Sequence, residues 1–320
     1  MITSKDNMLC ILRILEEYSD ENHILTVNDI AAKLRLDYQK EKVDRRTIYS
    51  AVKGLEDLGY DISDYEENHI GYYLRERRFS AAEIRLLLDA VYSCKYISKK
   101  QSEELLEKIR SFLSVNERKK YSYTTIINPE KKSPNPEVFL NIEVLDQAIS
   151  EKRKISFDYY EYNDRKELVK HKEKRYVASP YALVCDNEHY YLVLIQDDET
   201  EKGPKFFRVD LIKDIVISDE KISISRKEAK LDNIKHIVYA YSGEPGMVEL
   251  LCDRTGLRYG IDKIGKDITV EPKDGRYRVV VTAAAEGMVY WALQFIKHVE
   301  VVKPDSLRGK IKDALKESKY

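Results

Sequence analysis

The apolar positions of the N-terminal quarter of the chain recur at helical spacing in three successive stretches. Within residues 7–18 leucines recur at every third position, which predicts an amphipathic helix. A shorter helix is expected over residues 25–34, with Thr26 or Asn28 as its N-cap. The third stretch begins at Asp44, whose carboxylate is a favoured N-cap.

Residues 60–79 are expected to form two short strands around a polar turn. Three helices followed by a β-hairpin are the outline of a winged helix-turn-helix, which we assign to residues 1–78. Two further helices are expected after it, because Ser80 and Ser98 each begin the pattern of a capping box. They open a region, residues 79–138, that we predict to be a helical linker ending in an extended arm that contains prolines.

The middle of the chain is rich in strand-like segments. After a helix over residues 137–153, four stretches rich in β-branched and aromatic residues follow: 154–162, 172–186, 189–198 and 205–219. Polar turns separate them. This pattern predicts an antiparallel, strongly curved sheet or small barrel, and we assign it, with its leading helix, to residues 139–222.

The last part of the chain, residues 223–320, begins with a connector. A strand, a helix, a hairpin turning at Asp274-Gly275, a helix, a strand and a final helix are expected after it. This order is ferredoxin-like. Trp291 lies in an amphipathic helix and is expected in the core or at an interface. The chain is therefore predicted to be an α+β multidomain protein.

Composition narrows the range of functions. The 320 residues include 35% charged residues, yet the formal net charge is only −1, which argues against a wholly basic protein that coats nucleic acid. The four cysteines are too far apart for a metal or redox pair, and no signal peptide or membrane span is predicted, so a cytoplasmic setting is expected. The histidines are scattered and no catalytic motif is present, so we expect no enzymatic activity, metal or cofactor.

The third predicted helix concentrates positive charge. Between Lys33 and Lys53 seven basic side chains stand against three acidic ones, a local charge of +4. Arg46, Tyr49, Ser50 and Lys53 are spaced i, i+3, i+4 and i+7, opposite the apolar stripe. A solvated polar face is the ordinary interpretation of such a pattern. A short helix before it and a predicted hairpin after it favour a surface that contacts phosphates and reads guanine.

The same helix resembles the recognition helix of bacterial WYL-domain transcriptional regulators. It matches the family pattern at seven positions: Arg45, Arg46, Thr47, Ile48, Tyr49, Leu55 and Gly59. It departs from that pattern at Ser50 and Ala51, where the family often has Arg-Asp. With the charge pattern, the resemblance implies a homodimer that contacts double-stranded operator DNA through one set of residues: Lys42, Arg45, Arg46, Thr47, Tyr49, Ser50 and Lys53.

Four blocks of the middle region are similar, in order and spacing, to the WYL domain, an Sm-like β-barrel: ISFDYYEYN, RYVASPYALV, HYYLVL and KFFRVDLIKDI. Tyr190, Tyr191 and Leu192 stand where the family has the Trp-Tyr-Leu triplet that gives it its name. The segment from Trp291 onward resembles the extension that usually follows this domain.

This resemblance implies a pocket that senses a single-stranded nucleic acid or nucleotide-like ligand through Ser179, Tyr181, Tyr191 and Arg208. An arginine offers a fork for phosphate, and an aromatic face can stack a base. Leu211 stands where the family commonly has a second arginine. Because neighbouring side chains on a strand face opposite sides, Tyr190 is expected to face the core and Tyr191 the pocket.

The sequence thus favours a ligand-responsive transcriptional regulator. The alternative is an accessory RNA- or single-strand-binding protein of a phage-defence system, in which the barrel is the main binding surface. A third interpretation, a protein-interaction scaffold, predicts no nucleic-acid binding. The relative affinity for duplex and single strands separates the three.

Overall fold

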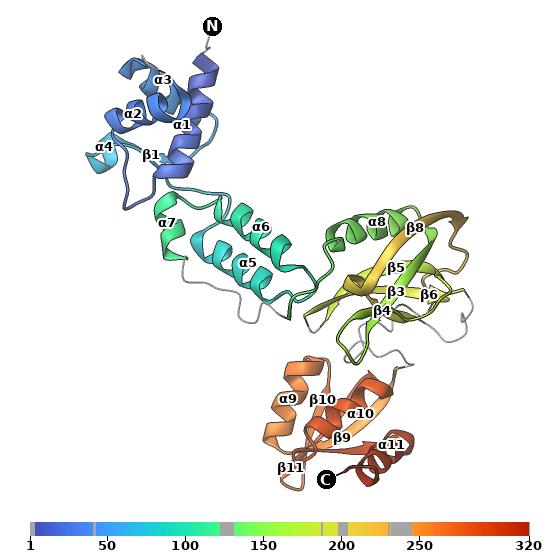
Figure 1. Ribbon diagram of the computed structural model, residues 1–320. Coiled ribbons are helices and arrows are strands. Elements are labelled where there is room, and N and C mark those ends of the chain that lie inside the picture. The colour runs from blue at the N-terminus through green and yellow to red at the C-terminus, as the bar shows by residue number, and fades with distance from the viewer. Residues whose placement is uncertain are drawn as a thin grey trace. The chain divides into compact units, whose positions relative to one another are not determined.

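The computed structural model describes residues 4–40, 43–121, 131–186, 188–197, 204–229, 231 and 245–319. Its internal contacts divide the chain into two compact units, Met1–Pro134 and Asn135–Tyr320, and each is described by itself. Helices occupy most of the first unit, and the second combines antiparallel sheets with helices (Figure 1). The predicted α+β organisation is confirmed.

The first unit begins with three helices that share one core: α1 (Ser4–Tyr18), α2 (Val27–Tyr38) and α3 (Arg45–Asp57). Aliphatic side chains at helical spacing are buried between them: Ile11, Ile14, Leu15, Ile30, Leu34, Ile48, Val52 and Leu55. Asp44 is the N-cap of α3, as predicted. Of the two candidates for α2, Thr26 is the cap, and it forms a reciprocal capping box with Asp29.

A short hairpin follows α3. Strands β1 (Ile62–Ser63) and β2 (Tyr73–Leu74) pair antiparallel, and the turn between them contains a helical turn, α4 (Tyr65–Asn68), that the sequence analysis did not predict. Leu25 and Tyr72 exchange two backbone hydrogen bonds, of 2.9 and 2.8 Å. Gly71 permits this close approach, since a Cβ atom there would lie 2.1 Å from the Leu25 carbonyl oxygen.

Three more helices follow in the first unit: α5 (Ala81–Ser93), α6 (Lys99–Arg110) and α7 (Val115–Lys120). Ser80 and Ser98 form the predicted capping boxes. Helix α7 departs from the prediction, which placed only an extended arm there. Ser114 and Glu117 form another capping box, and this local signal explains the helix. Residues 122–130 of the predicted arm lie outside the described residues.

The second unit opens with α8 (Val138–Ser150), which packs on a curled antiparallel sheet (Figure 1). The sheet has six strands: β3 (Arg153–Tyr162), β4 (Leu168–Lys170), β5 (Tyr176–Asp186), β6 (His189–Gln196), β7 (Lys205–Arg208) and β8 (Ile212–Lys221). Their order is β4-β3-β5-β6-β7, and β8 also pairs with β3. The long strand β3 therefore pairs with three other strands, β4, β5 and β8, along different parts of its length.

A turn interrupts the last strand-like segment of this sheet. The sequence predicts one strand-like stretch over residues 205–219, but a 3₁₀ turn, η3 (Val209–Leu211), separates β7 from β8. Strand β7 pairs with β6, whereas β8 pairs with β3, so the turn carries the chain from one strand neighbour to another. All three side chains of the turn are buried.

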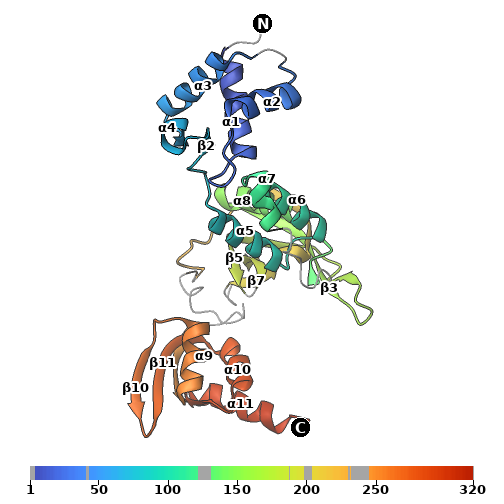
Figure 2. The same ribbon diagram turned by 90° about the vertical axis from the view of Figure 1, so that its left-hand side faces the viewer.

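The C-terminal part of the second unit has its elements in the predicted order: β9 (Pro245–Cys252), α9 (Arg254–Ile264), β10 (Thr269–Lys273), β11 (Arg276–Ala284), α10 (Ala285–Gln294), β12 (Val299–Lys303) and α11 (Asp305–Lys316). The strand order is β10-β11-β9-β12, with α9 and α10 on one face (Figure 2). Trp291 is fully buried in this core, as predicted. In the described part of the chain, no helix combines the length and apolar character needed to cross a membrane.

Replacing Gly71 by alanine is predicted to destabilise the first unit by about 1–3 kcal/mol, the usual cost of forcing atoms into a packed contact. Equilibrium unfolding in urea measures this. Gly309→Ala is the matched control, because its Cβ would meet nothing within 4 Å and helix α11 favours alanine there. Equal changes in unfolding free energy for the two variants would contradict the close approach at Leu25.

Candidate nucleic-acid interface and ligand site

One face of α3 is exposed and polar. Arg46, Tyr49, Ser50 and Lys53 all lie at the surface, whereas the apolar stripe of the same helix is buried against α1 and α2. Positions three, four and seven residues apart share one side of a helix. The structure therefore brings these four predicted DNA contacts together on one surface.

The beginning of α3 lies beside α2. Nη2 of Arg45 donates a hydrogen bond to Oδ1 of Asn28 at 3.2 Å, so this exposed guanidinium bridges the two helices. Thr47 is half-buried. Lys42, the remaining predicted DNA contact, lies outside the described residues.

The hairpin after α3 carries the opposite charge. The exposed side chains of Glu66 and Glu67 occupy its helical turn. Arg75 is paired with Asp61 at 2.8 Å and also with Glu67. Because phosphates are repelled by carboxylates, α3 is better suited than this hairpin to contact a nucleic-acid backbone.

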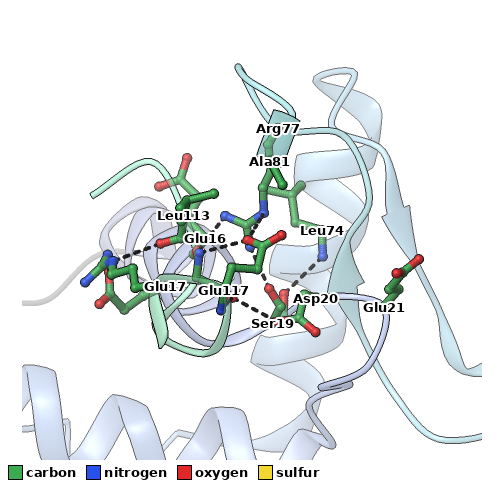
Figure 3. A network of polar contacts seen from close by, with 12 residues as sticks. Glu16, Glu17, Ser19, Asp20, Glu21, Leu74, Arg77, Ala81, Leu113 and Glu117 are labelled. Atoms are coloured by element: carbon green, nitrogen blue, oxygen red, sulfur yellow. Dashed lines mark hydrogen bonds and ion pairs between the residues drawn. The ribbon is translucent and has the colours of Figure 1, made fainter. Parts of the chain in front are cut away.

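A network of polar contacts joins the end of α1 to the segment that leads into α5 (Figure 3). The buried hydroxyl of Ser19 donates to the carbonyl oxygen of Leu15 at 2.7 Å and accepts from the N–H of Leu74 at 3.1 Å. Arg77 donates to the carbonyl oxygens of Glu16 and Ser19, at 2.7 and 2.6 Å. These contacts satisfy carbonyls that the last turn of α1 leaves without helical partners.

The same network reaches α7. Ser114 donates to Oδ2 of the buried Asp20 at 2.8 Å, and Nδ1 of His23 lies 2.7 Å from Oδ1. Arg118 donates to a carboxylate oxygen of Glu17 at 2.8 Å. Burial acts to raise the pKa of Asp20, but hydrogen bonds from His23 and Ser114 hold it below its ordinary value. The ionised carboxylate of Asp20 thus connects the end of α1 to α7, one of the linker helices α5 to α7.

In the second unit, a buried carboxylate holds Arg208 at the end of β7. Nε and Nη2 of Arg208 donate to Oδ1 and Oδ2 of Asp210, at 3.1 and 2.7 Å. The Asp210 side chain is 1% exposed, whereas that of Arg208 is 30% exposed. Burial acts to lower the pKa of Arg208, but the hydrogen bonds to Asp210 raise it above its ordinary value. Two of the guanidinium nitrogens of Arg208, which was predicted to bind a phosphate, are therefore already hydrogen-bonded to Asp210.

Tyrosines flank this ion pair. Tyr191 lies directly opposite Arg208 in the β6–β7 pairing. The hydroxyl of Tyr159 on β3 accepts a hydrogen bond from the backbone N–H of Arg208 at 3.3 Å. Burial raises the pKa of Tyr159 to about 12, so this hydroxyl keeps its proton. Tyr190 is half-buried, on the side of β6 that also carries the fully buried Leu192.

The other two predicted ligand residues are buried in the sheet. Tyr181 packs in an apolar cluster with Val193 and Ile195, and its hydroxyl donates to the carbonyl oxygen of Ile224 at 2.9 Å. Ser179, on the same strand, is 2% exposed. The structure therefore places the half-buried Tyr191 and Arg208 opposite one another on neighbouring strands, whereas it engages Tyr181 with a backbone acceptor.

Sequence reasoning missed several polar side chains around Arg208: Tyr159, Asp210, Asn135 and Asn141. Two of them carried a usable signal, because an isolated polar residue in an apolar run is commonly buried and hydrogen-bonded. Asp210 interrupts the apolar run of η3, and Asn141 stands among aliphatic residues of α8. No group of three or more His, Cys, Asp or Glu side chains suited to a metal ion occurs in the described ranges.

Comparison with protein-family models gives two matches. Residues 141–217 match the WYL domain, and residues 244–318 match the WCX domain. The first match runs from α8 to β8 and contains the Arg208 site, and the second runs from β9 to α11. No match was found among curated proteins.

Two solved structures are similar to the chain at low sequence identity. Proteasome accessory factor B/C (PafBC) of Arthrobacter aurescens is 17% identical, with a TM-score of 0.29, over 99% of this chain and 49% of that one. A CRISPR Cas-related protein is 15% identical, with a TM-score of 0.37, over 98% of this chain and 90% of that one. The chain thus spans about half the length of PafBC.

The stability of the first unit is predicted to fall in acid through Asp20. Because its pKa is lowered in the folded protein, its contribution is present above the ordinary value of 3.8 and is lost as the pH falls through the lower folded-state value. Asp20→Asn should be less stable than the wild type at about pH 6 and should lose less stability between about pH 6 and pH 3. Urea unfolding at both pH values measures this. Asp57→Asn, at an exposed position of α3, is the control, and an identical pH dependence of both variants would exclude the assignment.

Proposed function

Since the chain belongs to the WYL-domain family, we propose that it is a ligand-responsive bacterial transcription regulator. The observation that carries this proposal is the exposed polar face of α3, where Arg46, Tyr49, Ser50 and Lys53 gather above a buried apolar stripe. In this proposal residues 1–78 are a winged helix-turn-helix, α3 is its recognition helix and the β1–β2 hairpin is its wing. A recognition helix reads base edges in the major groove while neighbouring basic groups contact phosphates.

The proposal extends to the other domains. The curled six-stranded sheet supports an Sm-like barrel, and the strand order β10-β11-β9-β12 supports a ferredoxin-like C-terminal domain. A homodimer would place two copies of α3 on a two-fold operator, because half-site spacing mirrors the symmetry of the protein. We assign DNA binding and regulation to the chain, and we assign no catalytic step to it.

The ligand proposed for the WYL domain is a single-stranded nucleic acid or a nucleotide. Arg208 would offer a phosphate the N–H groups beyond those that Asp210 accepts, and Tyr191 on the neighbouring strand would stack a base. Leu211, at the position of the family's second arginine, is buried. A single arginine at the site favours a ligand held through one phosphate group.

A second function, from a different class, is favoured by the basic surface after β4. Four side chains there are exposed: Lys170, His171, Lys172 and Lys174. Close by in the sheet, the ammonium group of Lys213 lies 4.7 Å from the ring centre of Tyr160. Basic groups interleaved with aromatic rings suit single-strand binding, which supports the accessory RNA- or single-strand-binding role as the alternative.

Arg46→Ala is predicted to weaken binding to operator duplex about tenfold or more, and to lower the slope of log affinity against log salt by about one. Fluorescence anisotropy with DNA from the protein's own upstream region, at several salt concentrations, measures both. Arg13→Ala, on the exposed side of α1, removes the same charge and is the control. Unchanged affinity and salt slope in Arg46→Ala would overturn the recognition-helix assignment.

Short single-stranded oligonucleotides are predicted to release the duplex from the wild type but not from Arg208→Ala. The duplex affinity of this variant without competitor should equal that of the wild type, because the substitution lies outside residues 1–78, which contain α3. Arg165→Ala, in the exposed β3–β4 loop, is the matched control. Single-strand binding by the wild type without any preference for duplex would favour the accessory-protein function.

A further inference from the structure

The turn that carries Asp210 is held by two buried asparagines. Nδ2 of Asn135 donates to the carbonyl oxygens of Asp210 and Ile212, at 3.0 and 3.3 Å. Nδ2 of Asn141 donates to those of Ile212 and Val209, at 2.8 and 3.4 Å. The exposed fractions of the two asparagines are only 2% and 4%. Together the two amides satisfy carbonyls of η3 and of the residue after it, which leave the regular sheet pairing at this point.

The two asparagines differ in what else they hold. Asn141 lies inside α8, within the same unit as the turn. Asn135 precedes α8 and is the first residue of the second unit. Its Oδ1 accepts the backbone N–H of Glu137 at 2.8 Å, so the same side chain also fixes the start of α8.

The residues just before Asn135 are fixed to the linker helices. The backbone N–H of Ser133 donates to the carbonyl oxygen of Lys95 at 2.8 Å. Nζ of Lys132 donates to the carbonyl oxygens of Val91 and Cys94, at 2.8 and 2.5 Å, at the end of α5. Only Pro134 separates Ser133 from Asn135 along the chain.

We propose that Asn135 is the positioning residue through which occupancy of the Arg208 site is passed to the linker helices. This inference rests on the proposed function and adds its regulatory path. A ligand phosphate that takes the N–H groups of Arg208 beyond those that Asp210 accepts shifts the guanidinium to which Asp210 is bound. Any shift of Asp210 moves its carbonyl, which Asn135 holds, and the change passes through Pro134 to residues bound at the end of α5.

Asn141 is expected to contribute to the ligand site but not to the coupling. It binds the same turn, but it lies inside α8 and not in the segment that connects α5 to α8. Its removal should loosen the ligand site without cutting the path to the linker. The pair therefore separates ligand affinity from coupling, since coupling is the factor by which one ligand changes the affinity for another.

The test measures two quantities for the full-length wild type, Asn135→Ala and Asn141→Ala. One is the affinity for a labelled single-stranded oligonucleotide, and the other is the ratio of duplex affinities without and with that oligonucleotide. Asn135→Ala should lose a coupling ratio of about 5–150-fold at saturating oligonucleotide, whatever the change in its single-strand affinity. Asn141→Ala should bind the single strand more weakly and keep the ratio at saturating oligonucleotide.

A full coupling ratio in Asn135→Ala would overturn the inference while leaving the proposed function intact. A wild type that never releases duplex would instead overturn the proposed ligand response itself. If Asn135→Ala fails to fold, hydrogen exchange in the wild type decides. The oligonucleotide should change the protection of the Ser133 and Glu137 amides, and unchanged protection of both at saturation would sink the inference.

Discussion

Backbone groups that leave regular secondary structure inside a protein need hydrogen-bond partners, because an unpaired buried group costs about 1–3 kcal/mol. Two places in this chain meet that constraint with buried polar side chains. At the end of α1, Ser19 and Arg77 contact backbone carbonyls, and at η3 Asn135 and Asn141 do so. The first place lies at the end of α1 and the second at the turn between β7 and β8, so the local geometry of each depends on a few hydrogen bonds.

Connections of this kind suit a regulator for a physical reason. A buried hydrogen bond is either made or lost, because it weakens steeply as its angle departs from linearity. Helices α5 to α7 carry such bonds at both ends, through Lys132 at the end of α5 and through Ser114 with Asp20 beside α7. A ligand can shift a conformational equilibrium only by binding two arrangements differently, and discrete hydrogen bonds define distinct arrangements.

The sequence predicted what local chemistry decides. Helical periodicity and the caps at Asp44 and Ser80 placed the helices, and the i, i+3, i+4, i+7 spacing placed the polar face of α3 on the surface. It did not give the break at η3, where the contacts join distant residues: Asn135 and Asn141 lie 75 and 71 positions from the carbonyls they hold. The partner of Arg208 was also missed, although Asp210 is only two positions away. Family resemblance placed Tyr181 among the ligand residues, and in the structure its hydroxyl donates to the carbonyl of Ile224.

The pairing of Arg208 with Asp210 changes what a ligand of this site must offer. A phosphate approaching a bare arginine is attracted over a long range, whereas one approaching this neutral pair gains little until its oxygens replace or share those of Asp210. In the proposed function a simple anion would therefore bind weakly, and a base stacked on Tyr191 would have to contribute a large part of the affinity. Asp210, whose carboxylate would impose this selectivity, lies on the turn η3 that Asn135 holds. A ligand that binds Arg208 would therefore also move this turn. The selectivity for the ligand and the response to it would then depend on the same side chain.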